Sequence, residues 1–226
     1  MTEAVKLAGV SLSLPVEDRE DLEILKGIDF SIEAGSKCGL VGPSGSGKTS
    51  LLTLIAGLRK PSAGQINILD ESIVEMDEEQ LADFRRANIG VVFQNFHLLP
   101  AMTALENAAI PLELAGAADA EERAYAALSQ VGLKERARHY PHQLSGGEQQ
   151  RTAIARAFVA SPKLVLADEP TGNLDGKTSE NVMETLEELI RTNKTTMLLI
   201  THNEALLDGV GQVARMNSGQ LSVAAA

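Results

Sequence analysis

The spacing of hydrophobic residues changes along the chain, from short alternating patterns near the N-terminus to longer helical patterns. Alternation over residues 25–32 predicts a strand, and residues 66–68 predict another before a turn. Residues 7–16 are apolar but short for a signal peptide, and an acidic segment follows them, so they also predict a strand. The N-terminal region is therefore expected to be rich in β-structure.

Farther along, short apolar runs alternate with helical patterns. The runs that predict strands lie at residues 38–41, 89–93, 164–167, 196–200 and 213–216. The patterns that predict helices lie at residues 50–56, 151–159, 179–191 and 203–208. A capping pattern at residues 77–80 indicates the start of one more helix. Such alternation predicts an α/β fold with a parallel sheet.

The middle of the chain carries a helical insert. Residues 105–138 are rich in Ala, Leu and Glu and contain few β-branched residues. No linker of distinct composition separates this insert from its flanks. We therefore expect one domain over residues 1–226, with a helical subdomain at about 96–160.

Composition limits the classes of function. The chain has 226 residues and a formal net charge of −11, so it lacks the basic character typical of nucleic-acid binding. Its single cysteine, Cys38, excludes an intramolecular disulfide and is expected to be a small buried residue. No apolar run approaches the roughly 18 residues that a membrane span needs.

The sequence GPSGSGKTS at residues 42–50 matches a phosphate-binding loop. In such a loop, backbone N–H groups surround phosphates, Lys48 reaches their oxygens and Thr49 meets Mg²⁺. A predicted strand precedes the loop and a helix follows it, which is the context that the motif needs. The dinucleotide-binding alternative lacks its third glycine. The expected ATP-binding residues are Gly42, Pro43, Ser44, Gly45, Ser46, Gly47, Lys48, Thr49 and Ser50.

Two later stretches also bear on phosphate chemistry. LSGGEQQR at residues 144–151 places Ser145 and two glycines at the start of a helix, which predicts either an anion site or an ordinary N-cap. LVLADEPTGNLD at residues 164–175 delivers Asp168 and Glu169 to the end of a buried strand. Open α/β sheets bind ligands at that edge, where such carboxylates can hold Mg²⁺ and orient water.

Taken together, these stretches resemble the ABC-type ATPase subunits over essentially the whole chain. The resemblance implies a P-loop α/β fold with a mixed sheet core, an N-terminal antiparallel β region and a helical subdomain. Residues 93–107, together with ADEPTGNLD, are similar to the branch that contains the LolD, MacB, FtsE and especially YbbA-type ATPases.

The resemblance also implies roles for individual residues. The catalytic set would be Lys48, Gln94, Glu169 and His202, and Mg²⁺ would be held by Thr49, Gln94 and Asp168. Asp175 falls on the loop that follows the catalytic carboxylate. The signature residues would cover the ATP of a second subunit in a head-to-tail homodimer; they are Ser145, Gly146, Gly147 and Glu148, where Glu148 replaces a common glutamine.

One position departs from the family pattern. Leu14 stands where an aromatic ring usually stacks on adenine. Two interpretations stay open: weaker, less base-selective binding, or an apolar face supplied by Leu14 or a neighbour.

The expected partner of the ATPase is a separate integral membrane permease, with which it would drive export, lipoprotein release or mechanical work. It would then be cytoplasmic and peripheral on the inner face of the bacterial inner membrane, with no direct nucleic-acid contact. The alternative is a soluble ABC ATPase of nucleic-acid repair or translation. Those proteins usually carry a second cassette, zinc modules or a long coiled coil, which this sequence lacks.

Overall fold

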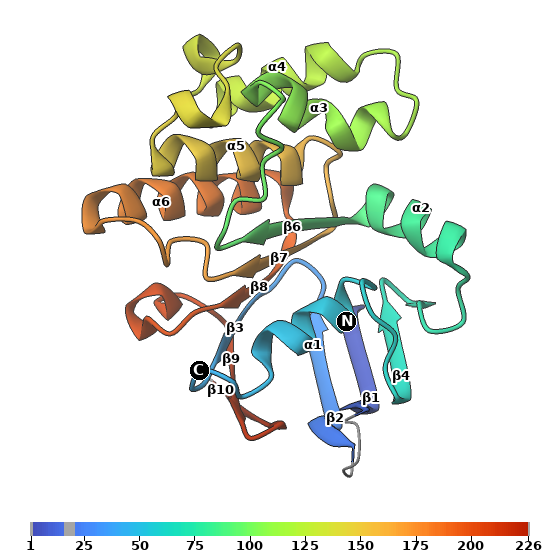
Figure 1. Cartoon of the computed structure of the whole chain (residues 1–226). Helices are drawn as coiled ribbons and strands as arrows, with labels where there is room; N and C mark the ends of the chain where they lie inside the picture. Colours follow the sequence, from blue (N-terminus) through green and yellow to red (C-terminus); the bar gives the residue numbers. More distant parts are fainter. Residues whose placement is uncertain (1, 16–20, 226) are drawn as a thin grey trace. The chain divides into compact units, whose positions relative to one another are not determined.

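A computed structural model describes residues 2–15 and 21–225 of the chain (Figure 1). The chain forms two compact units, one of Met1–Arg85 with Thr196–Ala226 and one of Arg86–Thr195. The expected helical subdomain at 96–160 falls within the second unit, and the single-domain organisation stays a prediction.

An antiparallel sheet opens the first unit, as the family resemblance implied. It contains β1 (Glu3–Leu14), β2 (Leu22–Glu33), β4 (Ala63–Ile68) and β5 (Glu71–Ser72), in the order β2-β1-β4-β5. The buried side chains of β1 include Val5, Leu7, Val10 and Leu12. The alternation of buried positions gains one residue between Leu7 and Val10, where the pairing with β2 is irregular. The strand expected at 7–16 begins earlier, and Val16 lies outside the described residues.

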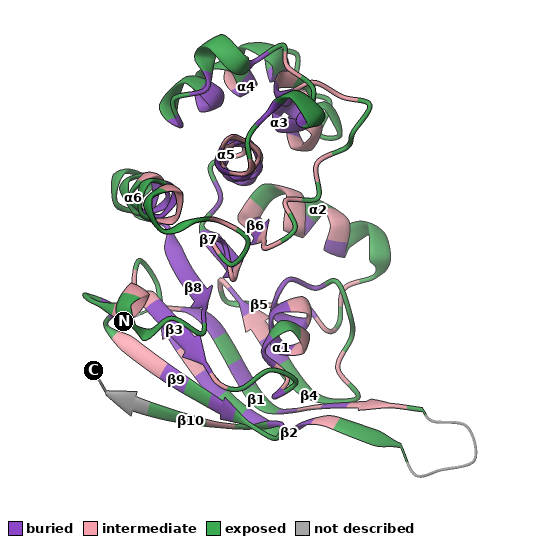
Figure 2. Cartoon of the chain, turned by 60° about the vertical axis from the view of Figure 1, so that its left-hand side comes forward, coloured by how far each residue is buried: buried purple, intermediate pink, exposed green. Residues whose placement is uncertain are grey.

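A second group of strands in the first unit carries the phosphate loop. It contains β3 (Lys37–Val41), β8 (Thr196–Ile200), β9 (Gln212–Asn217) and β10 (Gln220–Ala225), in the order β10-β9-β3-β8. The strands β8 and β9 run parallel to β3, whereas β10 is antiparallel to β9, so the sheet is mixed. All five residues of β8 are buried (purple in Figure 2), which explains its continuous apolar run.

Among the shorter elements of this unit, one helix agrees with the sequence-based expectations and two other elements differ from them. The helix α1 (Lys48–Ile55) follows β3 as predicted. The helix expected at 203–208 is a single 3₁₀ turn, η3 (Glu204–Leu207), which Asn203 starts by accepting a hydrogen bond from the Ala205 N–H. The strand β10 was not predicted, because its alanine-rich end has little strand character.

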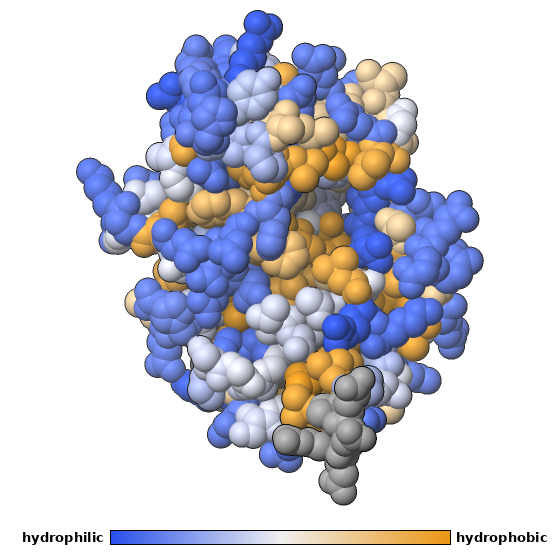
Figure 3. Space-filling view, viewed as in Figure 1, coloured by the Kyte–Doolittle hydropathy of each residue, from blue (hydrophilic) through white to orange (hydrophobic). Residues whose placement is uncertain are grey.

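The helix α2 (Glu78–Asn88) leads the chain from the first unit into the second. Asp77 and Gln80 exchange backbone-to-side-chain hydrogen bonds at its start, which confirms the predicted cap. Only Leu81 and Phe84 are buried, and its polar surface is blue at the right of Figure 3.

The second unit combines two parallel strands with helices. The strands are β6 (Ile89–Phe93) and β7 (Leu164–Asp168). The helices are α3 (Ala104–Glu113), α4 (Ala120–Gln130), α5 (Gly146–Phe158) and α6 (Gly176–Asn193), with short 3₁₀ turns η1 (Lys134–Arg136) and η2 (Pro141–Gln143). Most of α5 is buried, whereas α6 buries one face (Figure 2).

Candidate functional site

The phosphate loop connects β3 to α1 in the first unit. Gly47 has a φ of 108° there, and a Cβ on it would lie 2.9 Å from Leu25 Cδ2 and 3.2 Å from the Ile24 carbonyl. A larger residue would therefore be strained and would push against β2. The glycine that the motif requires at this position also allows the loop to turn closely into the helix.

Lys48 lies inside the loop that precedes it. Its ammonium group donates to the carbonyls of Gly42 at 2.8 Å and Pro43 at 2.9 Å, and the side chain is largely buried. The buried Ser46 hydroxyl has no hydrogen-bond partner among the described residues. A buried hydroxyl without a partner is costly, so this group is suited to bind a ligand oxygen.

The turn between β9 and β10 supports the loop from behind. The Gly219 N–H donates to the Ser46 carbonyl at 3.1 Å, and the Lys26 N–H donates to the Gly219 carbonyl at 2.9 Å. A Cβ on Gly42 would collide with the Met216 carbonyl. The loop therefore rests on β2 and on the β9–β10 turn as well as on its own strand and helix.

His202 follows β8, and the phosphate loop follows β3. Because Leu40 pairs with Ile200 in this parallel register, His202 and Gly42 leave the sheet at the same edge. His202 is exposed, and the Asn203 N–H donates to Thr201 Oγ1 at 3.0 Å, which fixes the turn around it. The structure thus brings His202 and the loop to one edge of the sheet.

Leu14 lies at the end of β1, where it pairs with Leu22 of β2. Leu14 is partly buried and Leu22 is exposed. This arrangement gives the antiparallel sheet an apolar pair at that end.

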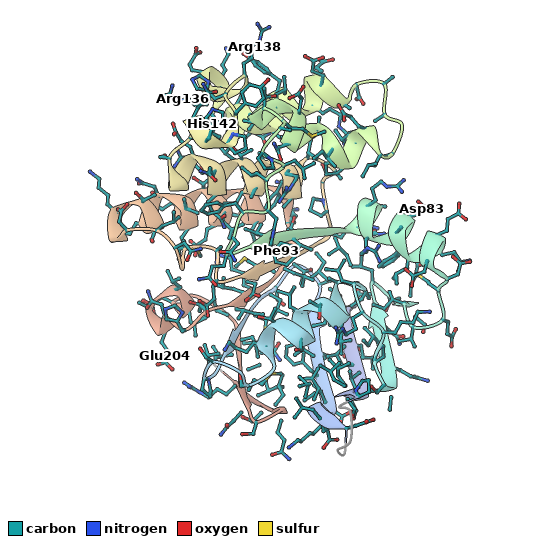
Figure 4. All side chains as sticks on the ribbon, viewed as in Figure 1. Asp83, Phe93, Arg136, Arg138, His142 and Glu204 are labelled. Atoms are coloured by element: carbon teal, nitrogen blue, oxygen red, sulfur yellow. The ribbon has the colours of Figure 1, made fainter. Side chains whose placement is uncertain are left out.

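In the second unit, two predicted residues meet beyond the ends of β6 and β7. Phe93 (labelled in Figure 4) pairs with Asp168, so Gln94 and Glu169 both follow directly at the same edge. A Cβ on Gly172 would lie 2.8 Å from Gln94 Nε2 and 3.2 Å from Glu169 Oε2. Both side chains therefore converge on this glycine.

Asn173 holds the segment of Gln94 in place. Gln94 Nε2 donates to Asn173 Oδ1 at 3.2 Å, and Asn173 Nδ2 donates to the Gln94 carbonyl at 3.2 Å and to Asn95 Oδ1 at 3.0 Å. Glu169 itself has a φ of 45°, a left-handed backbone that non-glycine residues seldom adopt and that is enriched at functional sites.

Ser145 and Glu148 start α5 with a capping box. The Ser145 N–H donates to Glu148 Oε2 at 2.8 Å, and the Glu148 N–H donates to Ser145 Oγ at 3.3 Å. Glu148 also pairs with Arg136 (labelled in Figure 4) at 3.0 Å. The Ser145 N–H is the main reason that the pKa of Glu148 lies below its usual value. The sequence-based N-cap interpretation is therefore confirmed.

The glycines of the signature lie against the start of α6. A Cβ on Gly146 would be 3.1 Å from Leu174 Cδ2, and one on Gly147 would collide with Thr178. Asp175 caps α6, accepting from the Thr178 N–H at 3.1 Å and from its hydroxyl at 2.8 Å. These bonds lower the pKa of Asp175.

The expected Mg²⁺ donors are a hydroxyl, an amide and a carboxylate, from Thr49, Gln94 and Asp168. Hard oxygen ligands of this kind suit Mg²⁺, which usually binds one or two protein groups together with phosphates and water. No group of three or more His, Cys, Asp or Glu that could hold a metal ion occurs in the described part of the chain.

Two residues that the motifs did not single out also contact the Gln94 segment. Arg156 donates to the carbonyls of Phe96 and His97, and Gln150 donates to the carbonyl of Phe93. Both belong to α5, and Gln150 is fully buried. No signal in the sequence pointed to either residue, because their contacts depend on how α5 packs against the segment after β6.

Comparison of the sequence with protein families and curated proteins gives several matches. A family model described as ABC transporter matches residues 25–172. The lipoprotein-releasing system ATP-binding protein LolD of Geobacter metallireducens is 48% identical over 202 residues, which cover 88% of this chain and 90% of that protein. The uncharacterized ABC transporter ATP-binding protein YbbA of Escherichia coli K12 is 43% identical, with 91% of each chain covered.

The fold is also similar to a solved structure. The dimeric structure of a post-hydrolysis state of the ATP-binding cassette MJ0796 bound to ADP and Pi matches with a TM-score of 0.90. The two chains are 35% identical, and 98% of each is covered.

No helix in the described part of the chain is both long enough and apolar enough to cross a membrane.

Proposed function

The chain belongs to the ABC transporter family and is an ATPase of that family, and from this premise we propose that it drives a separate membrane permease. The permease would lie in the bacterial inner membrane, with the ATPase at its cytoplasmic face. The names of the LolD relatives support lipoprotein release as the process, and export or mechanical work on envelope components is the broader class.

ATP binding is assigned to the phosphate loop. The observation that carries this assignment is the position of Lys48, whose ammonium group lies at the carbonyls of Gly42 and Pro43 inside the glycine loop. Backbone N–H groups at the start of α1 and the buried Ser46 hydroxyl add donors for phosphate oxygens. Pro43, Ser44, Gly45 and Ser50 complete the loop.

Thr49, Asp168 and Gln94 would hold Mg²⁺, which supplies positive charge to the phosphates as they separate. Their donor atoms match the preference of this ion for oxygen. Glu169 would accept a proton from the attacking water. It is the carboxylate that directly follows the end of β7, and its side chain lies with that of Gln94 beside Gly172. His202 would donate to the γ-phosphate from the edge where the loop begins.

The signature is assigned to the ATP of a second copy of the chain. Ser145 is exposed at the N-terminus of α5, where backbone N–H groups and the helix dipole favour an anion. Gly146, Gly147 and Glu148 would add to this contact, and Asp175 would lie beside it through α6. The dimeric state named for the MJ0796 cassette supports a homodimer with two equal sites.

A variant that binds ATP without hydrolysing it tests this assignment. We expect Glu169→Gln with Mg-ATP to elute as a stable dimer, and the further substitution Ser145→Arg to return it to a monomer. Ser129→Arg is the matched control, since Ser129 lies outside the signature at the end of α4. Strictly monomeric elution of Glu169→Gln under saturating Mg-ATP would refute the dimer.

Association with a permease requires a separate test. The chain should co-purify from membranes with an integral membrane protein. If the chain and a candidate permease are overexpressed together and repeatedly fail to associate, the transport role would be disfavoured. ATP hydrolysis stimulated by nucleic acid would instead support the soluble repair or translation class, which the names of the relatives and the net charge of −11 disfavour.

A further inference from the structure

The helix α5 contacts the chain on both sides of Gln94. Gln150 Nε2 donates to the Phe93 carbonyl at 3.3 Å, just before Gln94. Arg156 Nη1 donates to the His97 carbonyl at 2.6 Å and Nη2 donates to the Phe96 carbonyl at 2.7 Å, just after it. One rigid element thus holds the segment that carries Gln94 at two points.

The part held by Arg156 is strained. Phe96 has a φ of 39° and His97 a φ of 49°, so two consecutive non-glycine residues adopt the left-handed backbone conformation. Such a conformation persists only where surrounding contacts impose it. The planar guanidinium suits this task, because its fork can bind two neighbouring carbonyls at once. The ring of His97 also packs edge-on against Phe93, with 5.0 Å between their centroids.

The same helix begins at the signature. A Cβ on Gly146 would lie 4.0 Å from the tip of the Phe96 ring, so the ring of this strained segment lies near the start of α5. We therefore expect a displacement of α5 to reach the Phe96 segment through the two hydrogen bonds of Arg156.

We propose that Arg156 is a positioning residue for Gln94: by holding the Phe96 and His97 carbonyls, it fixes the conformation in which Gln94 serves ATP hydrolysis. This inference rests on the assignment of Gln94 to the ATPase site. It predicts a defect in turnover, because ground-state ATP binding depends on the phosphate loop.

Arg123 provides a control that separates positioning of Gln94 by Arg156 from a role of Arg156 in stability alone. Arg123 Nη2 donates to the carbonyl of Val159, the C-cap of α5, at 3.1 Å. Arg123→Ala therefore removes an arginine-to-carbonyl contact at the same end of the same helix without touching the Gln94 segment. Thermal unfolding should show a loss for both variants, and a smaller one for Arg123→Ala, because Arg123 donates one hydrogen bond to a carbonyl and Arg156 donates two.

The first measurement reports on the segment and needs no activity. The chain contains two tyrosines and no tryptophan, so Phe96→Trp introduces a single indole that can be excited selectively. We expect acrylamide quenching of this indole to increase when Arg156→Ala is added, to increase less with Arg156→Lys, and to stay unchanged with Arg123→Ala. Equal quenching in all four proteins would overturn the proposal.

The second measurement is steady-state Mg-ATP hydrolysis by the full chain with Phe96 retained. Misplacement of a catalytic group typically costs on the order of 10- to 100-fold. We expect Arg156→Ala to lower kcat by that amount with little change in KM, Arg156→Lys to recover part of the loss, and Arg123→Ala to match the natural chain. An unchanged kcat in Arg156→Ala, a loss confined to KM, or an equal loss in Arg123→Ala would overturn the proposal.

The variant Gln94→Ala separates this proposal from the function it rests on. If Gln94→Ala lowers kcat and Arg156→Ala does not, the inference about Arg156 is wrong and the ATPase assignment stands. If Gln94→Ala leaves kcat unchanged, the role of Gln94 is wrong, and the role of Arg156 falls with it. Should Arg156→Ala not fold, Arg156→Lys and Arg156→Gln provide the same comparison with one or more donors retained.

Discussion

At the scale of single residues, several predicted site residues also stabilise the fold. Ser145 and Asp175 start α5 and α6 with side-chain hydrogen bonds, and Lys48 binds the carbonyls of its own loop. The sequence left Ser145 open between an N-cap and an anion site. The structure confirms the cap, and the exposed end of α5 still offers its N–H groups, so the two interpretations are compatible.

Cys38 gives a prediction about reactivity. The thiol is fully buried, and burial raises its pKa to about 12, so the reactive thiolate is scarce at neutral pH. We expect Ellman's reagent at pH 8 to leave the native chain unmodified and to label one thiol after denaturation. Since Cys38 is the only cysteine, any fast labelling of the native protein would contradict its burial.

Leu14 gives a prediction about base selectivity. If the absent ring weakens base binding, Leu14→Tyr should bind ATP more tightly by about 1–3 kcal/mol, the range for stacking on an aromatic ring. Isothermal titration with ATP and GTP would measure the gain and the change in preference. Leu58→Tyr, at an exposed leucine outside β1, is the control. Unchanged affinities for Leu14→Tyr would favour the apolar pair of Leu14 and Leu22 as a sufficient base contact.

At the scale of elements, burial decided which predictions succeeded. The strands at 38–41, 164–167 and 196–200 are buried and the strand at 89–93 is partly buried, so their apolar runs located them closely. The elements that were missed or altered are short or lie at an edge: β5 has two residues, η3 is one turn, and β10 pairs with one neighbour. Such elements are defined by hydrogen bonds to neighbouring segments, and the spacing of hydrophobic residues in the sequence does not reveal these bonds.

The start of α3 gives a prediction about pH. The Thr103 N–H donates to Glu106 Oε2 at 2.7 Å, which holds the pKa of Glu106 below its usual 4.5. The contribution of this carboxylate to stability is therefore present above pH 4.5 and is lost as pH falls through the lower, folded-state pKa. Urea unfolding at pH 7 and below pH 4 should show a smaller acid-induced loss for Glu106→Gln than for the natural chain.

The glutamine variant keeps an oxygen that can accept the same bond, so its stability at pH 7 should change little. Glu187→Gln, at an exposed position on α6, serves as the control and should keep the acid dependence of the natural chain. An identical pH dependence of all three proteins would exclude a role for Glu106 in acid stability.

At the scale of the whole molecule, the expected residues divide between the two compact units. The phosphate loop, His202 and Leu14 belong to the first, and Gln94, Asp168, Glu169, the signature and Asp175 belong to the second. Short motifs predicted these residues because each lies where a strand ends or a helix begins. Arg156 and Gln150 escaped prediction, since their contacts depend on how α5 packs against the segment after β6.

Nucleotide binding should stabilise the whole chain. We expect Mg-ATP to raise the melting temperature of Glu169→Gln, because a ligand at about 100 times its Kd contributes roughly 2.7 kcal/mol. Adding Lys48→Ala should remove most of this increase, since Lys48 lies where the phosphates are expected. Differential scanning calorimetry at several ATP concentrations would measure the effect, and an equal increase in the Lys48→Ala protein would refute the location of the site.

The β9–β10 turn supports the phosphate loop through a backbone hydrogen bond. Gly219 has a φ of 80°, and a Cβ there would lie 2.5 Å from the Ile24 carbonyl, so a bulkier residue would displace the turn. The displaced turn would pull on Ser46 through the single hydrogen bond that joins them. A substitution at Gly219 should thus weaken ATP binding, although Gly219 lies outside every motif that defines the family.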